Sequence, residues 1–320
     1  MKRFSVLLMA MMCFALTGKS QNDEFKPGGK PFMKIFSNYH TTFSDGASNS
    51  AFQLERWYFG YEYQFSENLS AKANLDIGDP GVGGLKMTAY VKNAYLKYRV
   101  ENLTVNFGLI GTNQFSLQEH AWGLRYVAKS FQDANKFNAS ADLGVSASYR
   151  FSDFLSADVI IANGEGYKKV QADSTFRYGI GATINPVKKL TARVYYDFSS
   201  KDYTQSSIAT FVGYAADNFS IGAEYNKQLN HGFVNGHDIS GTSFYATVKA
   251  SKKLKLFARY DDLTSASDWN SSKDGQLYIA GLEYAPVKGI KFSPNFKGWS
   301  PADSNKAFSS SIFLNCEIKF

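Results

Sequence analysis

The sequence has few cysteines and histidines, and it lacks the common sequence motifs of hydrolases, metalloproteases and dithiol enzymes. Its 320 residues hold two cysteines and four histidines. Cys13 falls in the N-terminal apolar run, so removal of that segment would leave Cys316 alone and exclude an intrachain disulfide. No G-x-S-x-G, HExxH or CxxC pattern occurs. The sequence therefore predicts none of the hydrolase, metalloprotease or dithiol chemistries that these motifs carry.

Long apolar runs are also missing, apart from residues 4–16. That run follows two basic residues and precedes small residues, which is the pattern of a secretory signal peptide. We expect residues 1–20 to be removed, with residues 21–31 as a polar periplasmic lead-in. No later segment approaches the roughly 20 apolar residues that a membrane helix needs.

A strong charge of one sign is missing as well. Loss of residues 1–20 would remove Lys2, Arg3 and Lys19, leaving 32 basic residues against 28 acidic ones. The basic residues are scattered and form no runs. This balance gives no reason to expect nucleic acid as a partner.

Aromatic residues, in contrast, make up 16% of the chain, beside only 7 prolines. In residues 154–163 every second residue from Leu155 to Ile161 is apolar, with Ser156 and Asp158 between them. A period of two predicts strands with one apolar and one polar face. A soluble β-sandwich shares this pattern, but its single core cannot easily bury so many aromatic rings. A lipid-facing barrel wall with interfacial aromatic belts accommodates them on its outer surface.

Connection lengths favour the barrel over the sandwich. Short turns follow the even-numbered strands, and connections of about 6 to 25 residues follow the odd-numbered ones, as expected when one rim faces the periplasm and the other the outside. We therefore predict an all-β fold, a transmembrane antiparallel β-barrel over residues 32–320. The sixteen expected strands are 32–43, 53–65, 69–78, 89–100, 102–112, 138–151, 154–163, 174–186, 189–199, 206–216, 218–227, 241–251, 253–262, 275–286, 288–299 and 307–320.

The last stretch, AFSSSIFLNCEIKF, alternates apolar and mostly polar residues and ends on Phe320. Such a closing strand resembles the assembly signal of bacterial outer-membrane β-barrel proteins. The bacterial outer membrane is therefore the expected location. Aromatic residues near strand ends, among them Tyr58, Phe59 and Phe320, are expected in the interfacial belts.

The longest connection, residues 113–137, is the third of the long set. Its apolar residues from Leu117 to Phe131 recur at helical spacing. A loop of this length inside a compact fold is usually functional. We expect it to fold into the barrel and narrow the bore; the alternative is a helix that caps the outer rim.

Several segments resemble the porin-like family that includes the phosphate-selective porins O and P. Family membership would imply a sixteen-stranded trimeric channel for small hydrophilic solutes. The dense arginine and lysine series associated with phosphate selectivity is missing. The resemblance therefore predicts a channel but does not predict selectivity for phosphate. The segments are LERWYFGYEYQFSENLSAKANLDIG (54–78), KNAYLKY (92–98), NFGLIGTNQF (106–115), WGLRY (122–126), SFQD (130–133) and DLGVSASYRF (142–151).

Alternation places a set of charged side chains on the inner face, where a channel would sort its solutes. The strand arginines and two loop cations are expected to form a positive wall facing an acidic group, because guanidinium groups stay charged and bind carboxylate or phosphate in a fork. The alternative for each is an ordinary lumen charge in a salt bridge. The pore-lining candidates are Arg56, Arg125, Lys129, Arg177, Arg193, Arg259, Lys34 and Glu119.

The predicted function is an outer-membrane porin that passes small polar solutes, with a mild preference for anions. The expected partners are small polar or anionic solutes, outer-membrane lipid and two further copies in a homotrimer; no catalysis, cofactor or metal is expected. His231 and His237 share one loop, but their separation is not a known metal-ligand spacing. A barrel-embedded hydrolase and a structural or adhesin barrel are the alternatives.

Overall fold

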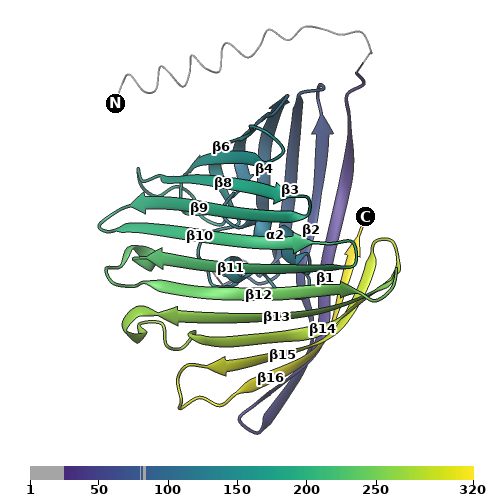
Figure 1. Ribbon diagram of the computed structural model, residues 1–320, viewed down its shortest axis with the longest axis vertical. Helices are drawn as coiled ribbons and strands as arrows, with labels where there is room; N and C mark the ends of the chain where they lie inside the picture. Colours follow the sequence, from purple (N-terminus) through teal and green to yellow (C-terminus); the bar gives the residue numbers. More distant parts are fainter. Residues whose placement is uncertain (1–24, 80, 82–83) are drawn as a thin grey trace.

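The computed structural model describes residues 25–79, 81 and 84–320, which form one closed antiparallel β-barrel (Figure 1). Sixteen strands follow one another around the wall in sequence order, and β1 closes the barrel by pairing with β16. The predicted fold class is confirmed. The predicted signal peptide over residues 1–20 lies outside the described residues, as do residues 21–24 of the lead-in.

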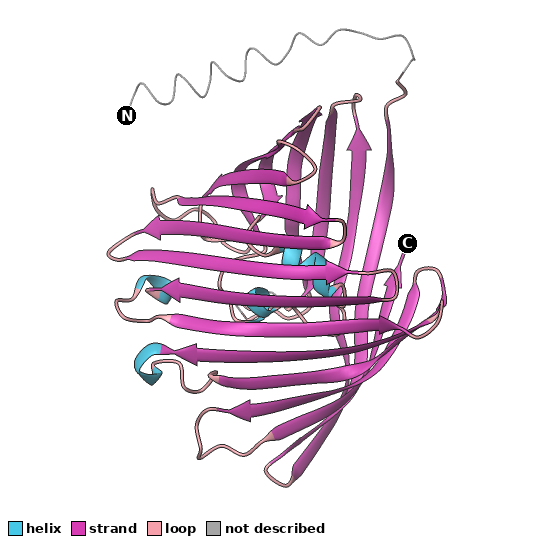
Figure 2. Ribbon diagram, viewed as in Figure 1, coloured by secondary structure: helices cyan, strands magenta, loops and turns pink. Residues whose placement is uncertain are grey.

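The strands have 8 to 18 residues, and all but one reach the roughly 9–11 residues that a tilted strand needs to cross a membrane; helices are few (Figure 2). Among the described residues, no helix is long and apolar enough to cross a membrane. The helical elements are α2 (Ser116–Trp122), α3 (Phe131–Ala134) and two short 3-10 helices (His231–Phe233 and Ala266–Asp268). The strands are β1 (Gly28–Ser44), β2 (Ala47–Gln64), β3 (Leu69–Gly78), β4 (Thr88–Val100), β5 (Leu103–Gly111), β6 (Ala141–Arg150), β7 (Leu155–Ala162), β8 (Arg177–Val187), β9 (Leu190–Ser200), β10 (Thr204–Ala215), β11 (Phe219–Leu229), β12 (Ile239–Lys249), β13 (Leu254–Ser265), β14 (Gly275–Val287), β15 (Ile290–Pro301) and β16 (Ser309–Lys319).

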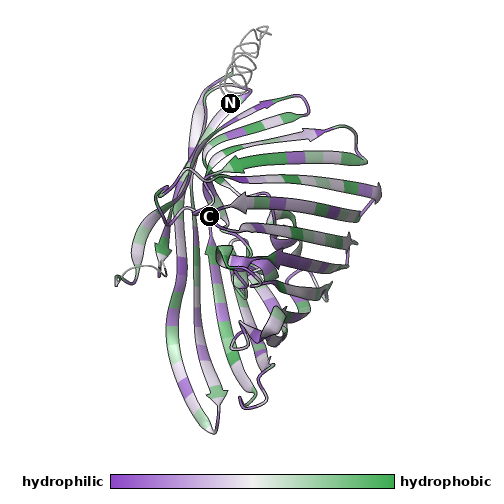
Figure 3. Ribbon diagram, turned by 90° about the vertical axis from the view of Figure 1, so that its left-hand side faces the viewer, coloured by the Kyte–Doolittle hydropathy of each residue, from purple (hydrophilic) through white to green (hydrophobic). Residues whose placement is uncertain are grey.

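Polar and apolar residues alternate along the strands (Figure 3), and this alternation becomes the two faces of the wall. On β9 the side chains of Val194 and Tyr196 are exposed on the outside, whereas Arg193 and Asp197 are buried on the inside. The reason is steric, because successive side chains of a strand point to opposite faces of the sheet. The barrel thus has a largely apolar outer surface and carries the buried charges of its strands on the inner face.

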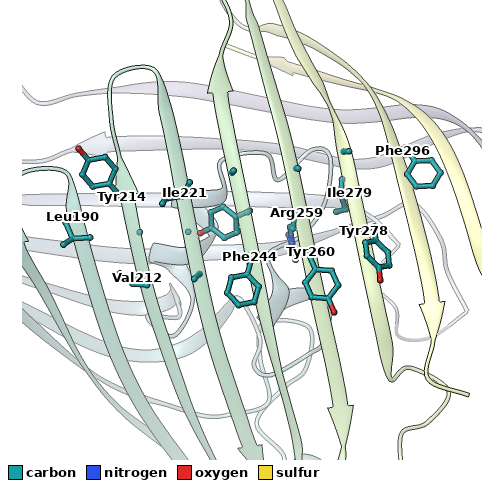
Figure 4. A pocket seen from close by; sticks show the side chains of 17 residues that line it. Leu190, Val212, Tyr214, Ile221, Phe244, Arg259, Tyr260, Tyr278, Ile279 and Phe296 are labelled. Atoms are coloured by element: carbon teal, nitrogen blue, oxygen red, sulfur yellow. The ribbon is translucent and has the colours of Figure 1, made fainter.

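The outer wall is hollowed where small residues lie side by side (Figure 4). Ala246, Ala258 and Ala280 pair with one another across β12, β13 and β14, and they leave a hollow of about 660 Å³. Among the described residues that line this hollow, Arg259 is the one charged residue, and it is itself buried. The outer wall at this level is therefore apolar.

Two of the expected long connections are short. β1 and β2 are joined by Asp45 and Gly46 alone, both at positive φ (49° and 74°), which suits a tight two-residue hairpin. β9 and β10 are joined by residues 201–203. β1 also begins at Gly28, inside the expected lead-in. The polar composition of these segments led to the wrong loop lengths, because a strand that rises above the apolar band can be polar on both faces.

The connection between β5 and β6, residues 112–140, lies inside the barrel as predicted and is called L3 below (Figure 2). The helical spacing from Leu117 to Phe131 corresponds to a helix only over its first part. Gly123 adopts a left-handed conformation (φ 66°) and its N–H caps the Glu119 carbonyl, so α2 ends at Trp122. Glycine takes this conformation without steric cost, and it commonly terminates helices. L3 therefore bends back along the wall between α2 and α3.

Candidate functional site

L3 is packed against one half of the inner wall through aromatic contacts. Trp122 is almost fully buried, and its ring meets the rings of Tyr245 at 5.5 Å and Phe257 at 6.0 Å, both edge-on. Phe131 and Phe137 form a second buried cluster with residues of β12 and β13. Aromatic side chains supply large buried areas, so these contacts hold L3 firmly in the bore.

Polar side chains of the same half of the wall bind the backbone of L3. Each donates a hydrogen bond to a carbonyl oxygen that L3 itself leaves unpaired, which satisfies buried acceptors in an otherwise irregular segment. The donors span β9 to β16. They are Arg193 to Asn113 O (3.0 Å), Gln228 to Phe137 O (2.7 Å), Arg259 to Lys129 O (2.6 Å), Lys297 to Val127 O (2.6 Å) and Asn315 to Tyr126 O (3.1 Å).

Three of the predicted arginines are held in buried ion pairs. Arg193 binds Asp158 at 2.6 Å, Arg177 binds Asp197 at 2.9 Å, and Arg259 binds Asp261 through two nitrogens at 2.6 and 2.8 Å. A Cβ at Gly181 would stand 2.4 Å from the Arg193 guanidinium, so glycine makes room for this arginine. Arg193 and Arg259 thus position L3.

A second group of charges faces L3 from the other half of the wall. Arg56 on β2 binds Asp76 on β3 at 3.0 Å and also donates to the Tyr90 hydroxyl. Tyr167, from the connection between β7 and β8, places its hydroxyl 3.5 Å from Asp76. Ring contacts join Tyr90 to Tyr167 at 5.9 Å.

L3 turns its own charges toward this group. Arg125 lies 3.8 Å from Glu119 and 3.6 Å from Asp133, and Lys129 lies 3.8 Å from Asp133. We call the two groups together the loop–wall cluster: Arg56, Tyr58, Asp76, Tyr90, Lys92 and Tyr167 from the wall side, and Glu119, Arg125, Lys129 and Asp133 from L3.

Lys92 is the cation of this cluster that was not among the predicted site residues. Asn74 on β3 pairs with Asn93, but Leu75 pairs with Val91, so Lys92 is the extra residue of a β-bulge. Strict alternation would place Lys92 on the outer face with the exposed Leu96. The bulge re-aims it inward, where its ammonium lies 4.9 Å from the ring centre of Tyr58 and 5.6 Å from that of Tyr167. Sequence periodicity carries no mark of a bulge.

The predicted positions of three aromatic residues and of Lys34 have different outcomes. Tyr58 is not in an outer aromatic belt, because it shares the inner face with Arg56 and packs edge-on against Phe36 at 5.8 Å. Phe59 and Phe320 are exposed on the outer side, as expected. Lys34 lies on β1 opposite Lys319, with its ammonium 5.8 Å from the Phe36 ring centre.

The structure therefore brings together only part of the predicted positive wall. Arg56, Arg125, Lys129 and Glu119 meet in the loop–wall cluster, whereas the remaining candidates lie elsewhere on the wall: Lys34, Arg177, Arg193 and Arg259. Within the described ranges, no three His, Cys, Asp or Glu side chains gather as a metal site.

The histidines of the 230–238 connection have a local packing role. His237 stacks on Trp269 with ring centres 4.3 Å apart and planes 5° apart, and His231 stacks on Trp269 at 5.6 Å. The Trp269 indole donates to the Asp238 carbonyl at 2.9 Å. Two neighbouring connections at one rim are thereby joined.

Comparisons with known proteins identify the fold. No protein family model and no curated protein matches the sequence. Among solved structures, OmpF of Salmonella typhi in complex with daunomycin superposes with a TM-score of 0.68 at 13% identity, covering 91% of this chain and 97% of that one.

Two further structures agree. An anion-selective porin from Comamonas acidovorans gives a TM-score of 0.66 at 11% identity, over 92% of this chain and 100% of that chain. OmpT of Vibrio cholerae, folded in vitro and in its trimer form, gives 0.63 at 13% identity, over 92% and 100%. At these identities the likeness concerns architecture, and the chain has the fold of the bacterial outer-membrane porins.

Proposed function

We propose that this protein is a bacterial outer-membrane porin through which small hydrophilic solutes diffuse passively. The observation that carries the proposal is the position of L3. It is fixed to the β9–β16 half of the wall and presents its charged side to the β2–β4 half. A passage bounded by charges on both sides sorts solutes by charge and size without any chemical step. Catalysis is not part of this proposal.

The passage is proposed to prefer anions mildly. In the loop–wall cluster, four cations stand against three carboxylates. Asp76 is bound by Arg56, and Asp133 is shared between Arg125 and Lys129. The remaining positive potential would attract anions and weaken with salt. One of the proteins with the same fold, from Comamonas acidovorans, is an anion-selective porin, which agrees with this preference.

We further propose a homotrimer in the outer membrane, with lipid against the apolar outer wall and the short turns toward the periplasm. The trimer form of Vibrio cholerae OmpT and the resemblance to porins O and P support this assembly. An alternating strand pattern with an outward apolar band suits a lipid environment.

Single-channel recording on the detergent-refolded protein in a planar bilayer tests the proposal. For a trimer, we expect conductance steps in groups of three. Under a KCl gradient, we expect a reversal potential whose sign shows that chloride passes more readily than potassium. Cation selectivity would overturn the anion preference. A barrel that shifts in mobility on heating but conducts no current would contradict the channel and leave the hydrolase and structural alternatives.

A further inference from the structure

We propose that Lys92 and Arg125 form a binding site for small dicarboxylates within the passage. This inference rests on the proposed channel function and deepens it, because it names a solute class and a saturable site. A general preference for anions requires only a positive electrostatic potential in the passage. A binding site also requires hydrogen-bond donors that the fold holds in fixed positions.

Lys92 supplies the first fixed donor. The β-bulge turns its side chain into the bore, and the rings of Tyr58 and Tyr167 hold its ammonium at 4.9 and 5.6 Å. Within the described part of the chain, no carboxylate lies within 4.0 Å of this ammonium. Cation–π contacts orient an ammonium but leave its N–H groups available, so Lys92 can donate to a solute carboxylate.

Arg125 supplies the second donor from the opposite element. Its carboxylate neighbours stand at 3.6 and 3.8 Å, clearly farther than the 2.6 Å of the Arg193 and Arg259 pairs. Hydrogen bonds to a guanidinium form at about 2.7–2.9 Å, so these neighbours balance the Arg125 charge without occupying its fork. A planar guanidinium fork suits a carboxylate.

Tyr58 connects the two donors. Lys92 lies over its ring, and Tyr58 also packs against the buried cluster that contains Leu124 and Tyr126, the neighbours of Arg125 in L3. A dicarboxylate carries two carboxylate groups, so one can meet the Lys92 ammonium and the other the Arg125 guanidinium, with the short carbon chain against the Tyr58 ring. A monocarboxylate offers only one such group. A compact tetrahedral anion would need several donors converging on one point, which two cations on separate elements do not provide.

Block of chloride current tests the site in the refolded channel. We would add succinate, acetate or phosphate at equal ionic strength and measure the open-channel conductance as a function of anion concentration. Succinate should reduce the current saturably in the unmodified protein, at concentrations at least about tenfold lower than acetate or phosphate.

Lys92→Gln and Arg125→Gln should each raise the succinate concentration for half-block by about tenfold. The matched control is Lys97→Gln, which removes the same charge from the same strand nearer the short-turn rim. Each variant must show the heat-modifiable mobility of a folded barrel before it is scored.

The outcomes separate the site from the channel. Saturable succinate block that is lost in both site variants and kept in the control would support the inference. Equal block by acetate, stronger block by phosphate, or equal loss in the Lys97 variant would overturn the dicarboxylate site while leaving an anion-preferring channel. A cation-selective channel would overturn the anion preference, independently of any block.

Discussion

Charged residues on the inner wall have two different structural roles. Arg193 and Arg259 pair with aspartates at 2.6 Å and also donate to L3 carbonyl oxygens. Lys92 instead meets aromatic rings. A buried charge is costly to leave without its partner. The arginines therefore contribute to stability, whereas the proposed solute site uses Lys92, whose neighbours are aromatic rings.

Substitution of Arg259 should test its structural role. Arg259→Gln leaves Asp261 as an unpaired buried carboxylate and removes the donor to Lys129 O. We expect a loss of about 3–5 kcal/mol in the free energy of unfolding, the usual cost of removing one member of a buried ion pair. Urea unfolding of the barrel in lipid vesicles, followed by tryptophan fluorescence, measures this.

The control for Arg259 is an ion pair at the surface. Lys189→Gln breaks the 3.0 Å contact with Asp217, whose side chain is 87% exposed, so it should cost only about 0–1 kcal/mol. If both variants unfold at the same urea concentration, Arg259 does not anchor L3.

At the scale of elements, the periodicity of the sequence predicted the strands, but it did not predict the bulge or the helix end that interrupt the regular pattern. All sixteen strands were expected, because each carries its own alternation of faces. The bulge at Lys92 and the helix end at Gly123 are single-residue events that depend on pairing and backbone conformation. The inner arginines were assigned to the correct face, but their partners depend on which strand lies beside which.

The connection at residues 230–238 should loosen in acid. Burial, followed by the charges of Lys273, His237, Lys136 and Arg177, lowers the pKa of His231 below 6.5. The unfolded connection then binds more protons than the native one as the pH falls below 6.5. The contribution of neutral His231 is complete above that value and decreases as the pH falls toward the lowered native pKa.

Hydrogen exchange followed by mass spectrometry measures this change. Between about pH 7.5 and about pH 5.5, protection of the 230–238 backbone should fall after correction for intrinsic exchange. The variant His231→Phe keeps a ring against Trp269 but cannot titrate. It should show no such fall, and a parallel loss in both proteins would assign the effect to another group.

For the whole molecule, closure of the barrel combines the separate strands into one continuous wall around L3. β1 pairs with β16 from Lys34 opposite Lys319 to Phe43 opposite Ser310. Closure leaves the polar faces together around L3 and the apolar faces outside. The sequence predicted this arrangement, because an even strand number and alternating connections suit a closed barrel. It could not predict which half of the wall L3 contacts, since that depends on side chains from several strands, among them β9, β11, β13, β15 and β16, meeting one segment.

In the proposed channel, ion selectivity arises from the electric field of charges that the barrel encloses. It should therefore depend on the salt concentration. At a constant ratio of KCl across the bilayer, we expect the anion preference to be largest near about 0.1 M and to decline toward about 1 M, as the Debye length falls from about 10 Å to about 3 Å. Lys92→Gln should reduce the preference at low salt and make it less dependent on salt, because one unshared cation of the cluster is lost. Reversal potentials at several absolute concentrations measure both effects. A preference that does not change with salt would mean that pore size, and not the charge of the loop–wall cluster, selects the ions.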